Sequence, residues 1–196
     1  MPAQAAPAAS KESFERSDLV SARLAAVATG KDILVTGLTT ATSLTYASPD
    51  GSLRSEVSVI PVRVAQGDGI WADVDYDLEK VDDGWAPKVS PSKVVFSAGG
   101  DGPAVSFGSA SRGFDLSWAK SLPEPTIDGN SAIYQLTDNE ALVLTATSDG
   151  FEQSLKLTAA PSSVPKQRLG FDMTGVTMIR NWIIRCCRQA GAGIHR

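Results

Sequence analysis

The chain has 196 residues, of which 42% are apolar and 20% are charged, and this composition excludes a globally disordered polypeptide. The formal net charge of −4 argues against a nucleic-acid-binding protein, which needs a dense basic surface to neutralise phosphates. The only histidine, His195, and the only cysteines, the adjacent Cys186 and Cys187, leave the rest of the chain without the commonest zinc ligands and without a Ser-His or Cys-His pair.

The first nine residues are rich in Ala and Pro, and they lack the basic and apolar segments of an intact signal peptide. They do contain Ala3-Gln4-Ala5, which resembles the A-x-A pattern of a cleavage site. Two interpretations stay open. Either the signal sequence is missing from this start site, which implies an extracellular or cell-wall-associated protein, or the segment is an ordinary Ala/Pro-rich tail.

One helix pattern occurs before the β-rich region, at residues 10–28. Apolar residues recur there at a spacing of three to four, at Phe14, Leu19, Val20, Leu24 and Val27. A serine at position 10 or 13 can cap the first turn, and a glycine at position 30 marks the end. We therefore expect one N-terminal helix that packs through a thin apolar stripe.

From residue 33 to residue 157 the apolar period changes to two, in short runs of β-branched and aromatic residues that are typical of strands. The clearest alternation puts Leu53, Val57 and Val59 on one face and Arg54 and Glu56 on the other. Further strand-like runs lie at 33–35, 44–46, 62–64, 70–74, 94–96, 105–107, 114–118, 132–134, 142–145 and 155–157.

Asp-Gly pairs divide this region at 50–51, 68–69, 83–84, 101–102, 128–129 and 149–150. Such a pair suits a two-residue type I′ hairpin turn, in which both central residues have positive φ. Pro123 and Pro125 indicate a rigid crossing between strands. The expected fold class is mainly β: an antiparallel, hairpin-rich sandwich or an irregular barrel with one N-terminal helix.

The composition changes at the Pro-containing segment 161–165 and again after Met178. Residues 179–196 carry four arginines and no acidic residue. They could form a basic amphipathic helix at an anionic membrane surface, but an out-of-frame translation, and hence a non-native tail, is the favoured interpretation.

No run of about 18 apolar residues occurs, so we expect no membrane span.

These changes divide the chain into four segments. We expect an Ala-rich tail and helix at 1–29, a β domain at 30–160, a Pro-containing continuation at 161–178 and the basic tail at 179–196.

Five motifs, taken in order, resemble a known family. They are G-I-W-A-D-V-D-Y-D-L at 69–78, G-W-A-P-K at 84–88, F-S-A-G-G-D-G-P at 96–103, L-S-W at 116–118 with L-P-E-P at 122–125, and G-F-E-Q-S-L at 150–155. Together they are similar to the N-terminal region of large secreted actinobacterial proteins that carry RHS/YD repeats, LamG-like jelly-roll domains or DNRLRE domains. The resemblance covers residues 30–177, most of the chain.

This resemblance implies a non-catalytic structural or spacer domain, with no catalytic, metal-binding or cofactor-binding residue, whose partners are the downstream domains of the parent chain. Two departures stand out. Residues 137–142 read T-D-N-E-A-L where the family has P-G-V-D-L, and after residue 177 the family continues with further strands and acidic residues where this chain has its basic tail. The second departure favours a fragment truncated by a frameshift.

Acidic residues could carry chemistry in two ways. Asp73, Asp75 and Asp77 alternate along a predicted strand and could hold Ca²⁺, but they lack the EF-hand spacing, so a solvated strand face is favoured. A glycosidase needs two carboxylates about 5–10 Å apart. The acidic residues considered for that role are Glu56, Asp73, Asp75, Asp115 and Glu152, and nothing in their spacing selects a pair.

Aromatic residues suggest a carbohydrate-binding module as the alternative function, with cell-wall polysaccharide as the candidate partner. Trp71 and Trp118 lie in alternating strands and are predicted to be core residues. Trp85 lies in a Gly-Trp-Ala-Pro segment that we expect to be an exposed loop, which makes it the best candidate for a glycan contact. The Gly-rich segment 99–102 lacks a following helix and a Lys-Ser/Thr pair, so a turn is expected there and not a phosphate-binding loop.

Overall fold

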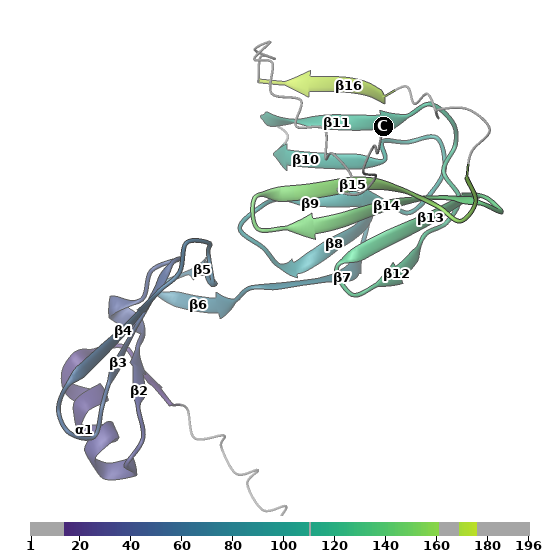
Figure 1. Ribbon diagram of the computed structural model, residues 1–196. Helices are drawn as coiled ribbons and strands as arrows, with labels where there is room; N and C mark the ends of the chain where they lie inside the picture. The colour runs from purple at the N-terminus through teal and green to yellow at the C-terminus, as the bar shows by residue number, and fades with distance from the viewer. Residues whose placement is uncertain (1–13, 110, 161–168, 176–196) are drawn as a thin grey trace, which may run out of the picture.

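The computed structural model describes residues 14–109, 111–160 and 169–175 (Figure 1). This part of the chain is mainly β, with hairpin-linked antiparallel strands and one α-helix near the N-terminus. The predicted fold class is therefore confirmed. The described sheets are open, and two of them face each other across a shared core, so the architecture is the sandwich and not the barrel. The α-helix is too short to cross a membrane, as is every other described helix.

The N-terminal lobe is a four-stranded sheet with one face packed against the helix, followed by a separate hairpin (Figure 1). The sheet order is β1-β2-β3-β4, and β1 pairs parallel with β2 while the other pairs are antiparallel. The elements are β1 (Glu15–Arg16), α1 (Leu19–Thr29), β2 (Ile33–Val35), the 3₁₀ helix η1 (Thr36–Leu38), β3 (Ser43–Ala47), β4 (Leu53–Val57), and the hairpin of β5 (Arg63–Gly67) and β6 (Ile70–Asp73).

Helix α1 begins later than the sequence pattern indicates. Asp18 caps it by accepting a 2.9 Å hydrogen bond from the Ser21 amide, and Gly30, at φ 68°, ends it. Residues 10–13, where the helix was expected to start, lie outside the described residues, and Glu15–Arg16 form β1 instead of a helical turn.

The helix also buries a different face from the predicted one. Ala22 and Ala26, both 0% exposed, pack against β2 and β3, whereas Val20, Leu24 and Val27 are 66–69% exposed. The helix is apolar on more than one side, so its apolar spacing does not by itself select the buried face. The small alanine side chains allow the helix to lie close to the sheet.

The C-terminal lobe is a sandwich of a six-stranded and a four-stranded sheet (Figure 1). The larger sheet has the order β16-β11-β10-β9-β8-β7 and consists of β7 (Asp75–Val81), β8 (Gly84–Val89), β9 (Val94–Ser97), β10 (Val105–Ser109), β11 (Arg112–Trp118) and β16 (Leu169–Thr174). The smaller has the order β12-β13-β14-β15 and consists of β12 (Thr126–Asp128), β13 (Ser131–Thr137), β14 (Glu140–Thr147) and β15 (Gly150–Leu157).

The sandwich core is contributed by both sheets. Phe96, Val105, Leu142 and Leu144 are each 0% exposed, and so is Tyr134, whose hydroxyl donates a 2.7 Å hydrogen bond to the Ser97 carbonyl on the facing sheet. This bond satisfies the one polar atom of a buried tyrosine side chain and ties the two sheets together.

Each Asp-Gly pair lies between neighbouring antiparallel strands, as predicted, but the turn type differs from the expectation. Only Asp68-Gly69, at φ 50° and 74°, has positive φ at both residues. Gly84, at φ 151°, is instead the first residue of β8, and a Cβ there would lie 2.0 Å from the Phe96 carbonyl oxygen. Glycine is thus required at this position by the close approach of two strands.

The two lobes are joined at Val74, between β6 and β7, and each has its own hydrophobic cluster. Arg63, 8% exposed, ties the N-terminal lobe together, because its guanidinium lies 2.9 Å from Glu15 and 2.8 Å from Asp73. The segment boundary expected at residues 29/30 falls between α1 and β2, which pack on each other here. The Ala-rich residues 1–13 and the basic tail 179–196 lie outside the described residues.

Candidate binding groove

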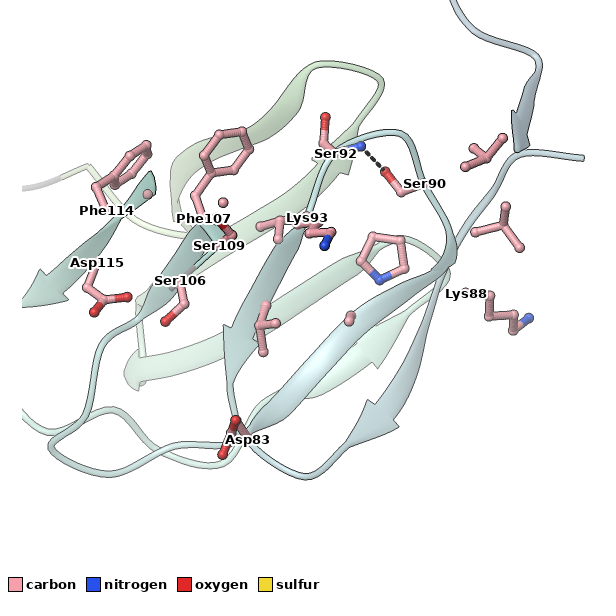
Figure 2. A pocket seen from close by; sticks show the side chains of 18 of the residues that line it. Asp83, Lys88, Ser90, Ser92, Lys93, Ser106, Phe107, Ser109, Phe114 and Asp115 are labelled. Atoms are coloured by element: carbon pink, nitrogen blue, oxygen red, sulfur yellow. Dashed lines mark hydrogen bonds between the residues drawn. The ribbon is translucent and has the colours of Figure 1, made fainter. Parts of the chain in front are cut away.

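A groove of about 820 Å³ lies along the six-stranded sheet and is also lined by Val64, Ala65 and Gln66 of β5 (Figure 2). Its floor is the face of the sheet turned away from the sandwich core. Four residues on adjacent strands cross its floor directly opposite one another: Asp172 on β16, Asp115 on β11, Ser106 on β10 and Val95 on β9. Side chains alternate along each strand, so this row faces outward while the next residue along β11, Leu116, enters the core.

Beside this row, the groove floor is formed by the backbone of two glycines on β10 and β11. Gly108 and Gly113 are opposite each other on β10 and β11, and Thr174 is opposite Gly113 on β16. A Cβ on Gly108 would lie 2.4 Å from the Arg112 carbonyl oxygen, and one on Gly113 would lie 2.3 Å from a neighbouring carbonyl oxygen. The hairpin geometry therefore excludes side chains here and leaves backbone as the floor.

Two like charges meet at one end of the row. Asp115 and Asp172 are register partners on neighbouring strands, an arrangement that destabilises a sheet unless another group offsets it. Ser106, Thr174 and Lys93 also line the groove. Together these groups can accept and donate hydrogen bonds to a hydroxyl-rich or cationic ligand.

Trp85 does not belong to this groove, and the expectation of an exposed loop is wrong. It lies in strand β8, is half-buried, and packs against the sandwich core opposite Phe96. Its strand neighbour Ala86 lines the groove, so Trp85 points to the opposite face. The Lys80 ammonium lies 5.0 Å from its ring centroid, and its buried Nε1 atom has no hydrogen-bond partner among the described residues. The glycan contact through Trp85 stays a prediction.

The three alternating aspartates do not converge. Asp73 pairs with Arg63, whereas Asp75 and Asp77 each lie 3.5 Å from the Lys88 ammonium. The negative charge of Asp75 raises the pKa of Lys88, and that of Asp77 adds to the effect. Partial desolvation of the ammonium group acts in the opposite direction and is outweighed. Asp73, the last residue of β6, and Asp75, the first residue of β7, belong to different strands and pair with different cations. In the described part of the chain, no group of three metal-ligating side chains comes together.

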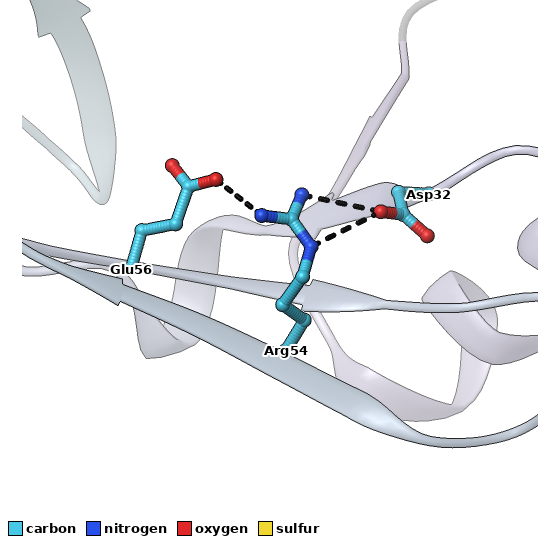
Figure 3. Close-up of polar contacts among 3 residues, drawn as sticks. All are labelled: Asp32, Arg54 and Glu56. Carbon is cyan, nitrogen blue, oxygen red and sulfur yellow. Dashed lines mark hydrogen bonds and ion pairs between the residues drawn. The ribbon is translucent and has the colours of Figure 1, made fainter.

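The other acidic residues considered for glycoside hydrolysis are dispersed. Glu56 pairs with Arg54 in the N-terminal lobe (Figure 3), and Glu152 lies on β15 of the four-stranded sheet. Only Asp115 lines the groove, and its partner Asp172 was missed by sequence reasoning. Nothing in the sequence signals that pair, because the register between β11 and β16 joins residues more than fifty positions apart.

Trp118, predicted to be a core residue, packs against the sandwich core, which also contains Tyr134. The same prediction is wrong for Trp71, which lies on β6, is half-buried and belongs to neither hydrophobic cluster. Residues 99–102 lie in the connection from β9 to β10, where Gly99 and Gly100 have φ of 105° and 93° and Gly100 is bridged to Leu122. A strand and not a helix follows these glycines, as expected.

No protein-family model, no curated protein and no solved structure matches this chain. The resemblance to the N-terminal region of secreted repeat proteins therefore stays a prediction, and the arguments about function that follow rest on the geometry of the molecule itself.

Proposed function

We propose that this chain is a non-catalytic structural or spacer module at the N-terminus of a large secreted or cell-wall-associated bacterial protein. In this role it packs against downstream domains of the parent chain. The observation that carries the proposal is an exposed apolar row on β16. This strand is the outermost one of the six-stranded sheet (Figure 1).

Leu169, Phe171 and Met173 form this row, and they are 37%, 50% and 39% exposed. They lie directly opposite Trp118, Leu116 and Phe114 on β11, which face the sandwich core. The Phe171 ring lies 6.1 Å from that of Phe114.

The row therefore extends the core to the edge of the larger sheet, where the described residues leave it open to solvent. Covering apolar surface contributes about 25 cal/mol per Å². A neighbouring domain placed there would stabilise both itself and β16, which is what a spacer in a chain of packed domains requires.

The proposal is tested by comparing thermal unfolding of this chain alone with that of the chain joined to the region encoded directly downstream. We expect a higher Tm for the sandwich in the longer protein, and the increase should be lost in Phe171→Ser. The same Tm in both proteins would contradict the proposal. Exposed Leu157→Ser on β15, 36% exposed, is the matched control and should leave the increase in place.

A carbohydrate-binding module is the alternative, and the groove is the observation that favours it. Its carboxylates and hydroxyls suit hydrogen bonding to sugar hydroxyl groups. Calorimetric titration with soluble cell-wall polysaccharide separates the two functions, because a spacer gives only heats of dilution. Saturable binding that is lost in Asp115→Asn and kept in Glu152→Gln would establish the groove as a glycan site. Loss in Trp85→Ala alone would instead support the contact predicted from the sequence.

A further inference from the structure

Strand β4 lies at the end of its sheet, and its alternating apolar and charged side chains are exposed. Leu53 and Val57 lie on the face that carries α1, yet they are 43% and 80% exposed, because the helix packs over β2 and β3 and does not reach β4. Every residue of β4 is exposed, and β3 is its only strand partner among the residues that the structure describes. An open strand edge with uncovered apolar side chains is a template for pairing with another strand.

The backbone hydrogen bonds show which residues of β4 point to the open edge. Ser58 donates to the Thr42 carbonyl at 2.8 Å, and Ser48 donates to the Ser52 carbonyl at 3.0 Å. Hydrogen-bonded pairs recur at every second residue of an antiparallel ladder, so the even-numbered residues of β4 bond to β3. The N–H and C=O groups of its odd-numbered residues therefore face the edge that no described strand occupies.

We propose that β4 pairs antiparallel with β4 of a second copy of the chain, centred on Ser55, so that the two four-stranded sheets become one. This register matches apolar to apolar, with Leu53 opposite Val57 of the other copy. It also matches charge to charge, with Arg54 opposite Glu56. Opposite-charge pairs in this position stabilise a sheet, and like charges destabilise it.

The charged residues already form exposed ion pairs within one chain, and these pairs can be exchanged. Within one chain Arg54 lies 3.1 Å from Asp32 and also pairs with Glu56, but its side chain is 48% exposed and that of Glu56 is 52% exposed (Figure 3). Pairs at such exposure contribute little to stability, so exchanging the Glu56 partner costs the monomer little. Arg54 and Glu56 occupy non-hydrogen-bonded positions of the new ladder, where facing Cα atoms are only about 4.5 Å apart.

Another strand at the end of a sheet, β15, serves as an internal comparison. Self-pairing about Ser154 would also match charges, with Glu152 opposite Lys156. However, Phe151 and Leu155 are already half-buried in the sandwich, so β15 has less apolar surface to cover than β4. We therefore assign the contact to β4.

Charge reversal tests the register. In Arg54→Glu both cross-strand pairs become acid opposite acid, and in Glu56→Arg both become arginine opposite arginine. We expect each variant alone to dissociate roughly 10- to 100-fold more readily than the unmodified protein. An equal mixture of the two variants restores opposite charges at both positions and should recover the dimer. Sedimentation measures this as the mass of two 20.5 kDa chains.

The mixture separates loss of pairing from loss of folding, because misfolded variants do not rescue each other. The proposal is overturned if the unmodified protein keeps the mass of one chain at its highest soluble concentration. It is also overturned if the variants dimerise as well as the unmodified protein, or if the mixture stays monomeric while both variants remain folded.

A disulfide between the two copies of residue 55, which face each other at the centre of the proposed pairing, gives a second readout. Directly opposite residues in a hydrogen-bonded pair have Cα atoms about 5.5 Å apart, which suits a disulfide. With Cys186 and Cys187 replaced by serine, Ser55→Cys should form a covalent dimer on mild oxidation, and Ser154→Cys should not. Equal cross-linking of the two variants, or cross-linking of Ser154→Cys alone, would refute the assignment to β4.

Discussion

Two buried tyrosine hydroxyls show how a single polar atom affects the stability of the sandwich. The Tyr134 hydroxyl donates to the Ser97 carbonyl across the two sheets, whereas the buried Tyr76 hydroxyl has no hydrogen-bond partner among the described residues. Burial raises the pKa of both side chains, with the charge of Asp149 adding to the effect at Tyr76. The same side chain is therefore satisfied at one site and unsatisfied at the other.

Replacing these tyrosines with phenylalanine should give opposite results. Tyr134→Phe removes the donor to Ser97 and should lower the free energy of unfolding by about 1–3 kcal/mol. Tyr76→Phe removes an unpaired hydroxyl and should leave the stability unchanged or slightly raised. Urea unfolding of both variants measures the difference. An equal loss in the two would show that the bond between the sheets contributes nothing.

At the scale of one element, helix α1 should be sensitive on its alanine face and tolerant on its leucine face. Ala26→Leu inserts a larger side chain into a contact with 0% exposure and should cost about 1–3 kcal/mol. Leu24→Gln, at a position 69% exposed, should change the stability of the monomer by less than about 0.5 kcal/mol. Thermal unfolding checks both, and a larger loss from Leu24→Gln would mean that the stripe predicted from the sequence is the buried one.

The cap of the same helix should depend on pH. Hydrogen bonds from the Ser21 side chain and backbone lower the pKa of Asp18 below its ordinary value of 3.8. A carboxylate with a lowered pKa stabilises the folded state above the unfolded-state pKa, and this contribution is lost as the pH falls through the folded-state pKa. The helical signal should therefore weaken on acidification below about pH 4.

Asp18→Asn is the control for this effect, because asparagine also caps helices but does not titrate. We expect the variant to match the unmodified protein at neutral pH and to lose less helical circular dichroism between pH 5 and pH 2. Identical acid profiles for the two proteins would remove Asp18 from the explanation.

The elements show which features could be predicted from the sequence. Alternating runs and Asp-Gly pairs predicted many of the strands and hairpins, since both signals are local. Strands β1, β7, β8, β12 and β16 were not among the predicted runs. The helix face could not be predicted, because valine, leucine and alanine surround it and only the position of β2 and β3 selects the alanines. Trp85 was expected in a loop because proline and glycine flank it, but β8 tolerates both.

The groove was beyond prediction for a different reason. Asp115 and Asp172 become neighbours only through the register of β11 with β16. Pairing between distant strands leaves no periodic trace in a single sequence, so neither the row of residues on the floor nor the opposed carboxylates could be found before the fold was known.

At the scale of the whole molecule, two lobes with separate cores are joined at Val74, and each lobe has an incompletely covered strand at an edge. In the N-terminal lobe the strand is β4, which we assign to a second copy of the chain. In the sandwich it is β16, whose apolar row we assign to another domain of the parent protein. A module whose uncovered surfaces lie at its edges is suited to joining other folded units.

Hydrogen exchange of the β16 amides tests this account most directly, with the chain alone compared with the chain joined to the region encoded downstream. If another domain covers Leu169, Phe171 and Met173, exchange across β16 should slow in the longer protein, because opening the strand would then also expose the new contact. The central strand β14 should change far less. Equal exchange of β16 in the two proteins would contradict the claim that this edge is a contact between domains.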